Sequence, residues 1–254
     1  MQFNIIKSAG RAFVLSICSA SFASADTLLV AVASNFTVTL QELAIAYDAQ
    51  TGHTLKISSA STGKLYAQIQ HGAPFDVFMS ADEKRADLLV HEAKADAAYA
   101  RVYALGKLVF ISNIQPVGDC ISVLSDARLK WLAIANPDTA PYGLAAQQVM
   151  QSLNLWDMLQ TRLVMGENIA QTLQFVSSTS ANAGFVAKSM LTGDARIERA
   201  CEWDVPADLY APVRQKMLVL KKSQDKPAVT AFWKFMQSAK ATSIIREHGY
   251  DVPG

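Results

Sequence analysis

The sequence has little charge and few cysteines, and these shortages exclude several classes of protein. Only 18% of the 254 residues are charged, the formal net charge is +1, and no block of like charges occurs. A disordered tail or a nucleic-acid binder with a basic stripe needs a compositional bias that this chain does not have. Three cysteines are too few for a small domain held by disulfides. The composition, 51% hydrophobic, is typical of a soluble globular protein of one or two domains.

The chain also lacks the short motifs of several enzyme classes and metal sites. It contains no Gly-x-Ser-x-Gly, HExxH or paired-acid motif. Its four histidines are scattered, and none has a ligand-like spacing to a cysteine. These absences favour a protein that is not an enzyme and needs no cofactor. An exported hydrolase stays open as an alternative.

The N-terminus has the features of a secretory signal peptide. Lys7 and Arg11 form a basic region, residues 12–23 are apolar or small, and an Ala-Ser-Ala cleavage pattern follows. The apolar run is too short to span about 30 Å of hydrocarbon, which argues against a membrane anchor. Lipidation at Cys18 is a further alternative, although an isoleucine precedes it where a small residue is preferred. We expect residues 1–25 to be the signal peptide and the mature chain to be periplasmic.

Export also decides how the remaining cysteines are interpreted. Only Cys120 and Cys201 follow the expected cleavage site. In an oxidising compartment an even pair forms a disulfide or remains as two buried thiols, and the sequence leaves both readings open.

Short β-branched or apolar runs alternate with segments of helical period. The runs predict strands at 28–32, 54–57, 75–79, 107–111, 132–135, 162–165, 184–186 and 217–220. Alternation of strands and helices is typical of an α/β fold with mostly parallel sheets. No repeat, low-complexity tract or Pro/Gly/Ser linker interrupts the pattern. Two lobes, if present, would therefore be joined by strands.

Small polar residues occupy the turns that lead from strand to helix. Such turns occur at 33–36, 58–63, 136–143 and 166–169, and none contains arginine. In an open α/β sheet, ligands bind at the carboxyl ends of strands, where the first N–H groups of helices are free to meet an anion. The alternative is that these residues only cap helices. The succession of hydroxyl-rich turns indicates a shared oxyanion site or a series of caps.

Seven segments stand in the order and spacing found in the periplasmic molybdate-binding proteins, which the mature chain resembles up to Tyr250. They are Val-Ala-Ser-Asn-Phe at 32–36, Ser-Thr-Gly-Lys-Leu-Tyr-Ala-Gln-Ile at 61–69, Gly-Ala-Pro-Phe-Asp-Val-Phe at 72–78, Ser-Ala-Asp at 80–82, Ile-Ala-Asn-Pro at 134–137, Ala-Pro-Tyr-Gly at 140–143 and Gly-Glu-Asn-Ile-Ala-Gln at 166–171. The resemblance implies a two-lobed periplasmic-binding-protein fold of type II. We expect lobe 1 to comprise 26–108 plus 219–254 and lobe 2 to comprise 109–218.

The resemblance also implies a function and a set of binding residues. The protein would capture molybdate, and tungstate as well, in the cleft between the lobes and deliver it to the membrane permease of an ABC importer. It would act as a monomer and would hold molybdenum as an oxyanion, without direct coordination. The expected contacts are Ser34, Asn35 and Thr62, helped by Ser61, from lobe 1, and Tyr142 with the backbone N–H of Ile169 from lobe 2.

One position departs from the better-known branch of that family. That branch has a tyrosine in the segment that reads Gly-Phe-Val-Ala at 184–187, and Ala187 has no side-chain donor. We expect Asn35 and Tyr142 to replace it. Lys64 either attracts the anion or is a solvated lysine in the first turn of a helix.

Molybdate at neutral pH is a dianion whose oxygens all accept hydrogen bonds, so a matching site contains donors only. Hydrogen bonds to a charged group contribute roughly 1.5–3 kcal/mol each, and several of them can hold a dianion without arginine. A carboxylate pointing inward would instead favour a protonated oxyanion, and we expect Asp138 and Glu167 to face solvent or cap helices. A binding protein for sulfate remains the main alternative, since its site also consists of donors.

Overall fold

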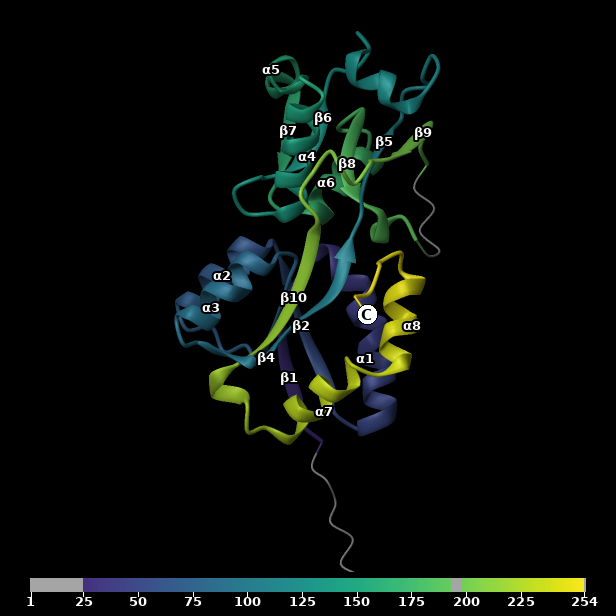
Figure 1. The fold of residues 1–254 in the computed structure, drawn as a ribbon. Helices are drawn as coiled ribbons and strands as arrows, with labels where there is room; N and C mark the ends of the chain where they lie inside the picture. Colours follow the sequence, from purple (N-terminus) through teal and green to yellow (C-terminus); the bar gives the residue numbers. More distant parts are fainter. Residues whose placement is uncertain (1–24, 193–197, 254) are drawn as a thin grey trace, which may run out of the picture.

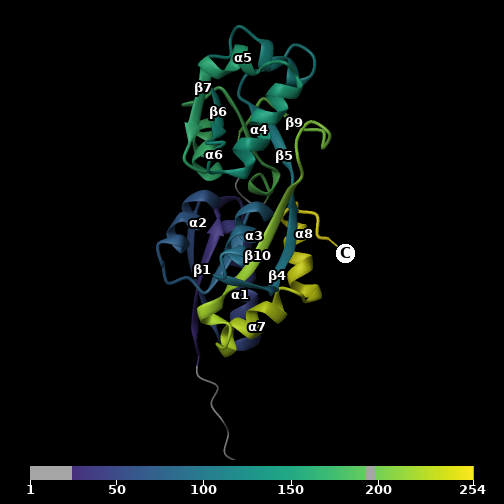
Figure 2. The ribbon, with the colours of Figure 1, turned by 60° about the vertical axis from the view of Figure 1, so that its left-hand side comes forward.

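The computed structural model describes residues 25–192 and 198–253, so all but the last residue of the expected signal peptide lies outside the described residues. The described chain forms two five-stranded sheets. Figure 1 shows the sheets in two lobes, one above the other, and Figure 2 shows the same division after a rotation. Among the described helices, none has the length and apolar character needed to cross a membrane.

The first sheet has the strand order β2-β1-β3-β10-β4. Its strands are β1 (Thr27–Ala33), β2 (Thr54–Ala60), β3 (Val77–Ser80), β4 (Ala95–Gly106) and β10 (Val213–Leu220). Strand β1 runs parallel to β2 and β3, whereas β10 runs antiparallel to β3 and β4. The helices of this lobe are α1 (Thr37–Thr51), α2 (Thr62–Gln70), α3 (Glu83–His91), α7 (Pro227–Phe235) and α8 (Ala239–Glu247), with short 3-10 turns η1 (Ser34–Phe36) and η5 (Lys221–Ser223).

The second sheet has the strand order β7-β6-β8-β5-β9. Its strands are β5 (Leu108–Ser112), β6 (Leu132–Ala135), β7 (Leu163–Gly166), β8 (Ala183–Ala187) and β9 (Cys201–Asp204). Strand β6 is parallel to β7 and β8, and β5 is antiparallel to β8 and β9. The helical elements are α4 (Pro141–Ser152), α5 (Trp156–Leu159), α6 (Ile169–Ser177), η2 (Cys120–Ser125), η3 (Gln160–Arg162) and η4 (Lys188–Met190). This mixed α/β, two-lobed architecture is the fold class expected from the sequence.

The chain passes between the lobes twice. It leaves the first sheet at the end of β4 and enters the second at β5, with Lys107 as the connecting residue. It returns through residues 205–212, because β10 pairs with both β3 and β4 of the first sheet. By sheet membership the return therefore precedes Val213, earlier than the boundary at 218 expected from the sequence.

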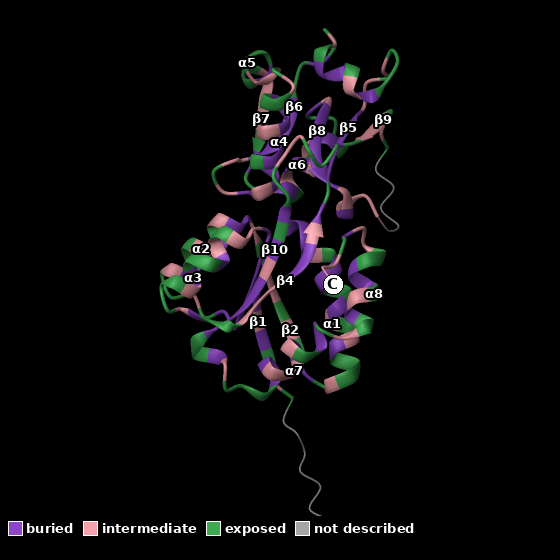
Figure 3. Ribbon diagram, viewed as in Figure 1, coloured by how far each residue is buried: buried purple, intermediate pink, exposed green. Residues whose placement is uncertain are grey.

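Packing on both faces of the first sheet explains why its central strands are almost wholly apolar. Residues 30–33 of strand β1 are at most 2% exposed. One hydrophobic cluster packs against each face of the sheet. A separate cluster fills the second lobe, where the rings of Phe110 and Phe185 lie 5.2 Å apart. In Figure 3 the buried residues follow the strands of both lobes, and exposed residues follow the outer helix faces.

A buried carboxylate lies at the base of the first lobe. Asp76 is 1% exposed and accepts hydrogen bonds from the backbone N–H of Leu29 at 2.8 Å, from Ser223 at 2.6 Å and from the Lys226 ammonium at 2.6 Å. Burial by itself raises the pKa of this carboxyl. The hydrogen bonds and the nearby charge outweigh burial, and the pKa lies below its usual value of 3.8.

The two cysteines among the described residues are bridged. Cys120 in η2 and Cys201 in β9 form a disulfide with their Cα atoms 5.6 Å apart. The bond joins segments 81 residues apart in sequence, so it closes a loop that contains most of the second lobe. Of the two readings left open by the sequence, the structure shows the disulfide.

Candidate functional site

A small cavity lies between the lobes at the carboxyl ends of strands β1, β2, β6 and β7. Its empty space is about 190 Å³, part of it open to solvent. All the residues predicted as oxyanion contacts line it: Ser34, Asn35, Ser61, Thr62, Tyr142 and Ile169. The rest of the lining is Ala33, Ala81, Ala140 and Pro141, so no charged side chain faces the cavity. The turns that seemed separate in the sequence therefore form one site.

The first turn presents backbone donors and one hydroxyl. Ser34 and Asn35 open η1 directly after β1, where the first N–H groups of a helical turn have no acceptor within it. Both residues are buried, at 8% and 4% exposure. Within the described chain the Ser34 hydroxyl has no hydrogen-bond partner, so it is available to a molecule in the cavity.

The side-chain amide of Asn35 does not donate into the cavity. Its Nδ2 donates one hydrogen bond to Gln215 Oε1 at 2.9 Å and another to the Tyr250 hydroxyl at 2.9 Å. An amide nitrogen has two hydrogens, so both are used inside the protein. Asn35 lines the cavity as expected, but its backbone N–H is the donor that remains for a ligand. The amide does not replace the donor that is missing at Ala187.

The second turn brings two hydroxyls to the cavity, and each accepts a hydrogen bond from a backbone N–H. Ser61 is the N-cap of α2, and its oxygen accepts from the backbone N–H of Lys64 at 3.4 Å. Thr62 is 1% exposed, and its oxygen accepts from the backbone N–H of Ala81 at 3.1 Å. A hydroxyl that already accepts a hydrogen bond keeps its proton to donate. Both residues can therefore serve as donors toward the cavity.

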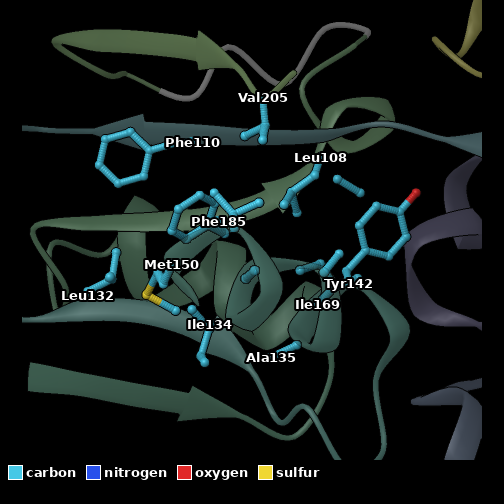
Figure 4. Packing of buried hydrophobic residues seen from close by; sticks show 14 of the residues in the cluster. Leu108, Phe110, Leu132, Ile134, Ala135, Tyr142, Met150, Ile169, Phe185 and Val205 are labelled. Atoms are coloured by element: carbon cyan, nitrogen blue, oxygen red, sulfur yellow. The ribbon is translucent and has the colours of Figure 1, made fainter. Parts of the chain in front are cut away.

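The second lobe contributes Tyr142 near the start of α4 and Ile169 at the start of α6. The Tyr142 ring packs in the core of that lobe, and Figure 4 shows its hydroxyl directed out of the cluster toward the N-terminal segment in purple. Burial raises the pKa of the Tyr142 hydroxyl well above its usual range, so this group stays protonated. Ile169 is the first residue of α6, and its N–H has no acceptor within the helix.

Gly106 makes room for the Tyr142 hydroxyl. A Cβ atom at residue 106 would lie 2.1 Å from the Tyr142 oxygen and 3.0 Å from Gln215 Nε2. Gly106 is the last residue of β4, at the first crossing between the lobes. The absence of a side chain at this point lets a tyrosine of the second lobe reach into the junction with the first.

The lobes contact each other directly around the cavity. The Gly63 N–H donates to the carbonyl oxygen of Thr139 at 2.8 Å. Arg85 donates to the carbonyl oxygen of Asp138 at 2.5 Å. Lys64 forms an ion pair with Glu167 at 2.8 Å, and the two side chains are 46% and 66% exposed. The structure is therefore a closed arrangement.

The ion pair bears on how the lysine and the two nearby carboxylates were interpreted from the sequence. Lys64 does not line the cavity and binds Glu167 at its edge. Asp138 and Glu167 are exposed, in agreement with the expectation that neither carboxylate enters the cavity.

Sequence reasoning missed three buried polar residues behind the cavity, Gln215, Tyr103 and Tyr250, which are hydrogen-bonded to one another or to the predicted residues Asn35 and Tyr142. We call Gln215, Asn35, Tyr103, Tyr142 and Tyr250 the Gln215 cluster. All are at most 4% exposed, and they are joined by hydrogen bonds through Gln215 and Asn35. Gln215 stands between Arg214 and Lys216 in the first half of β10, so the sequence pattern did not mark it as buried.

The described residues hold no group of three or more His, Cys, Asp or Glu side chains that could bind a metal ion. Together with the uncharged lining, this leaves hydroxyl and backbone N–H donors as the chemistry of the cavity. Such a set suits a small anion whose oxygens carry no protons.

Comparisons with known proteins show the family of the chain. The profile of the family described as bacterial extracellular solute-binding protein matches residues 28–251. The molybdate-binding protein ModA of Azotobacter vinelandii is 42% identical over 232 residues, covering 91% of this chain and 92% of that protein. ModA of Rhodobacter capsulatus is 38% identical over 228 residues, covering 90% and 89%. The solved structure of the Azotobacter vinelandii periplasmic molybdate-binding protein matches with a TM-score of 0.84 at 38% identity, covering 89% of this chain and 100% of that one. The chain therefore belongs to the family of bacterial extracellular solute-binding proteins.

Proposed function

We propose that this protein captures molybdate, and tungstate as well, and delivers it to the permease of an ABC importer. The observation that carries the proposal is the cavity lined by Ser34, Ser61, Thr62 and Tyr142 without any charged side chain. The names of the relatives at 42% and 38% identity support the same ligand. We further propose that the protein works as a monomer in the periplasm.

The donors of the cavity are sufficient for a dianion. Hydroxyls of serine, threonine and tyrosine and the N–H groups at the starts of η1 and α6 give several hydrogen bonds to a charged acceptor. Each contributes roughly 1.5–3 kcal/mol, and helix N-termini add roughly 0.3–1 kcal/mol apiece. After the loss of association entropy, a dissociation constant between about micromolar and nanomolar is expected.

Capture would proceed by closure of the lobes. The contacts proposed for the anion are divided between the first lobe (Ser34, Asn35, Ser61 and Thr62) and the second (Tyr142 and Ile169). An anion that touches both lobes has its full affinity only for the closed arrangement and shifts the population toward it. The importer would then recognise the closed form.

Isothermal titration of the mature protein with molybdate, tungstate, sulfate and phosphate tests the proposal. We expect tight binding of molybdate and tungstate, and at least about tenfold weaker binding of sulfate, because donors spaced for the larger tetrahedral anion would be left partly unpaired by the smaller one. Equal affinity for sulfate would refute the assignment and favour a sulfate carrier. Size-exclusion chromatography with light scattering checks the monomer.

A further inference from the structure

The Gln215 cluster has one consistent direction of hydrogen bonding. Gln215 lies on β10, the strand that follows the second crossing between the lobes, and its side chain is fully buried. Its Oε1 accepts from Asn35 Nδ2 at 2.9 Å and from the Tyr103 hydroxyl at 3.1 Å. A carbonyl oxygen only accepts, so these two donors of the first lobe fix the orientation of the Gln215 amide.

The fixed orientation of the Gln215 amide determines whether the Tyr142 hydroxyl accepts or donates their shared hydrogen bond. Gln215 Nε2 is 3.4 Å from the Tyr142 hydroxyl oxygen, and an amide nitrogen only donates. The Tyr142 oxygen must therefore accept this hydrogen bond, and its own proton must point elsewhere. Among the described residues no acceptor binds that proton, and the hydroxyl belongs to a residue that lines the cavity.

Hydrogen bonds between Asn35 and Tyr250 also fix the other end of the Gln215 cluster. The Tyr250 oxygen accepts from Asn35 Nδ2, and the Tyr250 hydroxyl donates back to the Asn35 carbonyl oxygen, both at 2.9 Å. Asn35 therefore cannot rotate its amide without losing two buried hydrogen bonds, and the bond from Tyr250 to its backbone carbonyl oxygen holds the residue in place. The orientation imposed on Gln215 is a property of the folded first lobe.

We propose that Gln215 is a positioning residue for oxyanion capture: by donating to the Tyr142 oxygen it turns the Tyr142 proton toward the cavity. The inference rests on the proposed function and deepens it. Gln215 does not touch the anion. It converts a hydroxyl that is able to donate or accept into a fixed donor, and it does so only when the second lobe brings Tyr142 against β10. The preference for an oxyanion without protons is in part a property of this one amide.

A double-mutant cycle on the mature full-length protein tests the proposal, with molybdate titrated into wild type, Gln215→Met, Tyr142→Phe and the double variant. Methionine has a similar volume but neither donor nor acceptor. We expect Gln215→Met to weaken molybdate binding about tenfold when Tyr142 is present, and less than about twofold in the Tyr142→Phe background. An equal loss in both backgrounds would overturn the proposal, because a merely structural glutamine acts regardless of the hydroxyl.

A second variant covers the case in which Gln215→Met does not fold. Gly106→Ala puts a methyl group where the Tyr142 hydroxyl lies and 3.0 Å from Gln215 Nε2, so it separates the two side chains without removing either of them. We expect about tenfold weaker molybdate binding, and unchanged affinity would overturn the proposal. Absence of oxyanion binding by wild type would refute the proposed function and this inference together. Normal wild-type binding without coupling between the two residues would refute only the role of Gln215.

Discussion

Replacing Gly63 by alanine should weaken molybdate binding without weakening the fold. Gly63 is the second residue of α2, and its backbone lies against Thr139 of the second lobe. The space between them is too small for a side chain at residue 63. A Cβ atom at residue 63 would lie 3.0 Å from Thr139 Cα, 3.1 Å from its carbonyl oxygen and 3.2 Å from its Cβ. The alanine must therefore push the lobes apart by a few tenths of an ångström.

The geometry sets the magnitude. Optimal separations between carbon atoms are about 3.5–4.0 Å, and overpacking of a close contact typically costs about 1–3 kcal/mol. The crowding exists only when the lobes are closed, so its whole cost appears in the binding equilibrium. Because Thr139 is not fully buried and can shift slightly, we expect about 1–2 kcal/mol, which is about a 5- to 30-fold higher dissociation constant.

The effect on stability has the opposite sign. Alanine favours a helix over glycine by roughly 0.5–1 kcal/mol, and that gain is present whether or not the lobes are closed. Isothermal titration of the Gly63→Ala variant should therefore show weaker binding, while its thermal unfolding without ligand is unchanged or slightly raised. Gln68→Ala, at an exposed position on the same helix, is the matched control and should leave the affinity unchanged.

The result that would refute this reasoning is an unchanged dissociation constant for Gly63→Ala. It would mean that molybdate is bound without the approach of α2 to Thr139 seen in the structure. A loss of thermal stability in the absence of ligand would count equally against it, because the crowding would then lie within a lobe.

Other changes should have separable effects. Tyr142→Phe should weaken molybdate binding by about 1–3 kcal/mol in titration calorimetry, because a donor to a charged acceptor is lost. Tyr47→Phe, which removes a buried hydroxyl that donates to the Ala228 carbonyl oxygen, should leave binding intact. The free energy of unfolding should fall as the pH drops below about 4, since Asp76 has a lowered pKa in the folded state and its stabilising contribution is lost on protonation. Asp76→Asn should lower the free energy of unfolding by about 2 kcal/mol at pH 7 and flatten its dependence on acid pH in denaturant titrations. An unaltered pH dependence would show that other groups cause the acid sensitivity. Reduction of the disulfide should lower stability by about 2–4 kcal/mol without altering the anion affinity, and a change in affinity would show that the bond shapes the cavity.

The sequence predicted most of the fold because short apolar strand runs and segments of helical period alternate clearly along it. The strands expected at 28–32, 54–57 and 132–135 are strands in the structure, extended by up to three residues at an end. Two strands were missed. Strand β4 is rich in alanine and has few β-branched residues, so its extended form comes from pairing with β10. Strand β9 is short and polar, and pairing with β5 and the disulfide hold it in place.

The candidate site was predictable at the level of its turns and not at the level of its hydrogen bonds. The small polar turns after strands indicated a shared oxyanion site or a series of caps, and the resemblance to the molybdate-binding proteins implied Ser34, Thr62 and Ile169 as contacts. The structure gathers these three residues around one cavity. The use of the Asn35 amide was not predictable, because its acceptor Gln215 lies 180 residues away in the sequence. Local pattern shows which residues begin a helix, but the partner of a buried amide depends on how distant strands meet.

The crossing between the lobes has a consequence for how the protein can be rebuilt. Gly106 and Val213 are paired residues of β4 and β10, so the chain leaves the first lobe and returns to it at neighbouring points. The whole second lobe is thus an insertion between two adjacent strand ends, and its disulfide lies entirely within it. A different second lobe, or a fluorescent protein that reports closure, can be spliced in at this one junction without threading the chain through the first sheet.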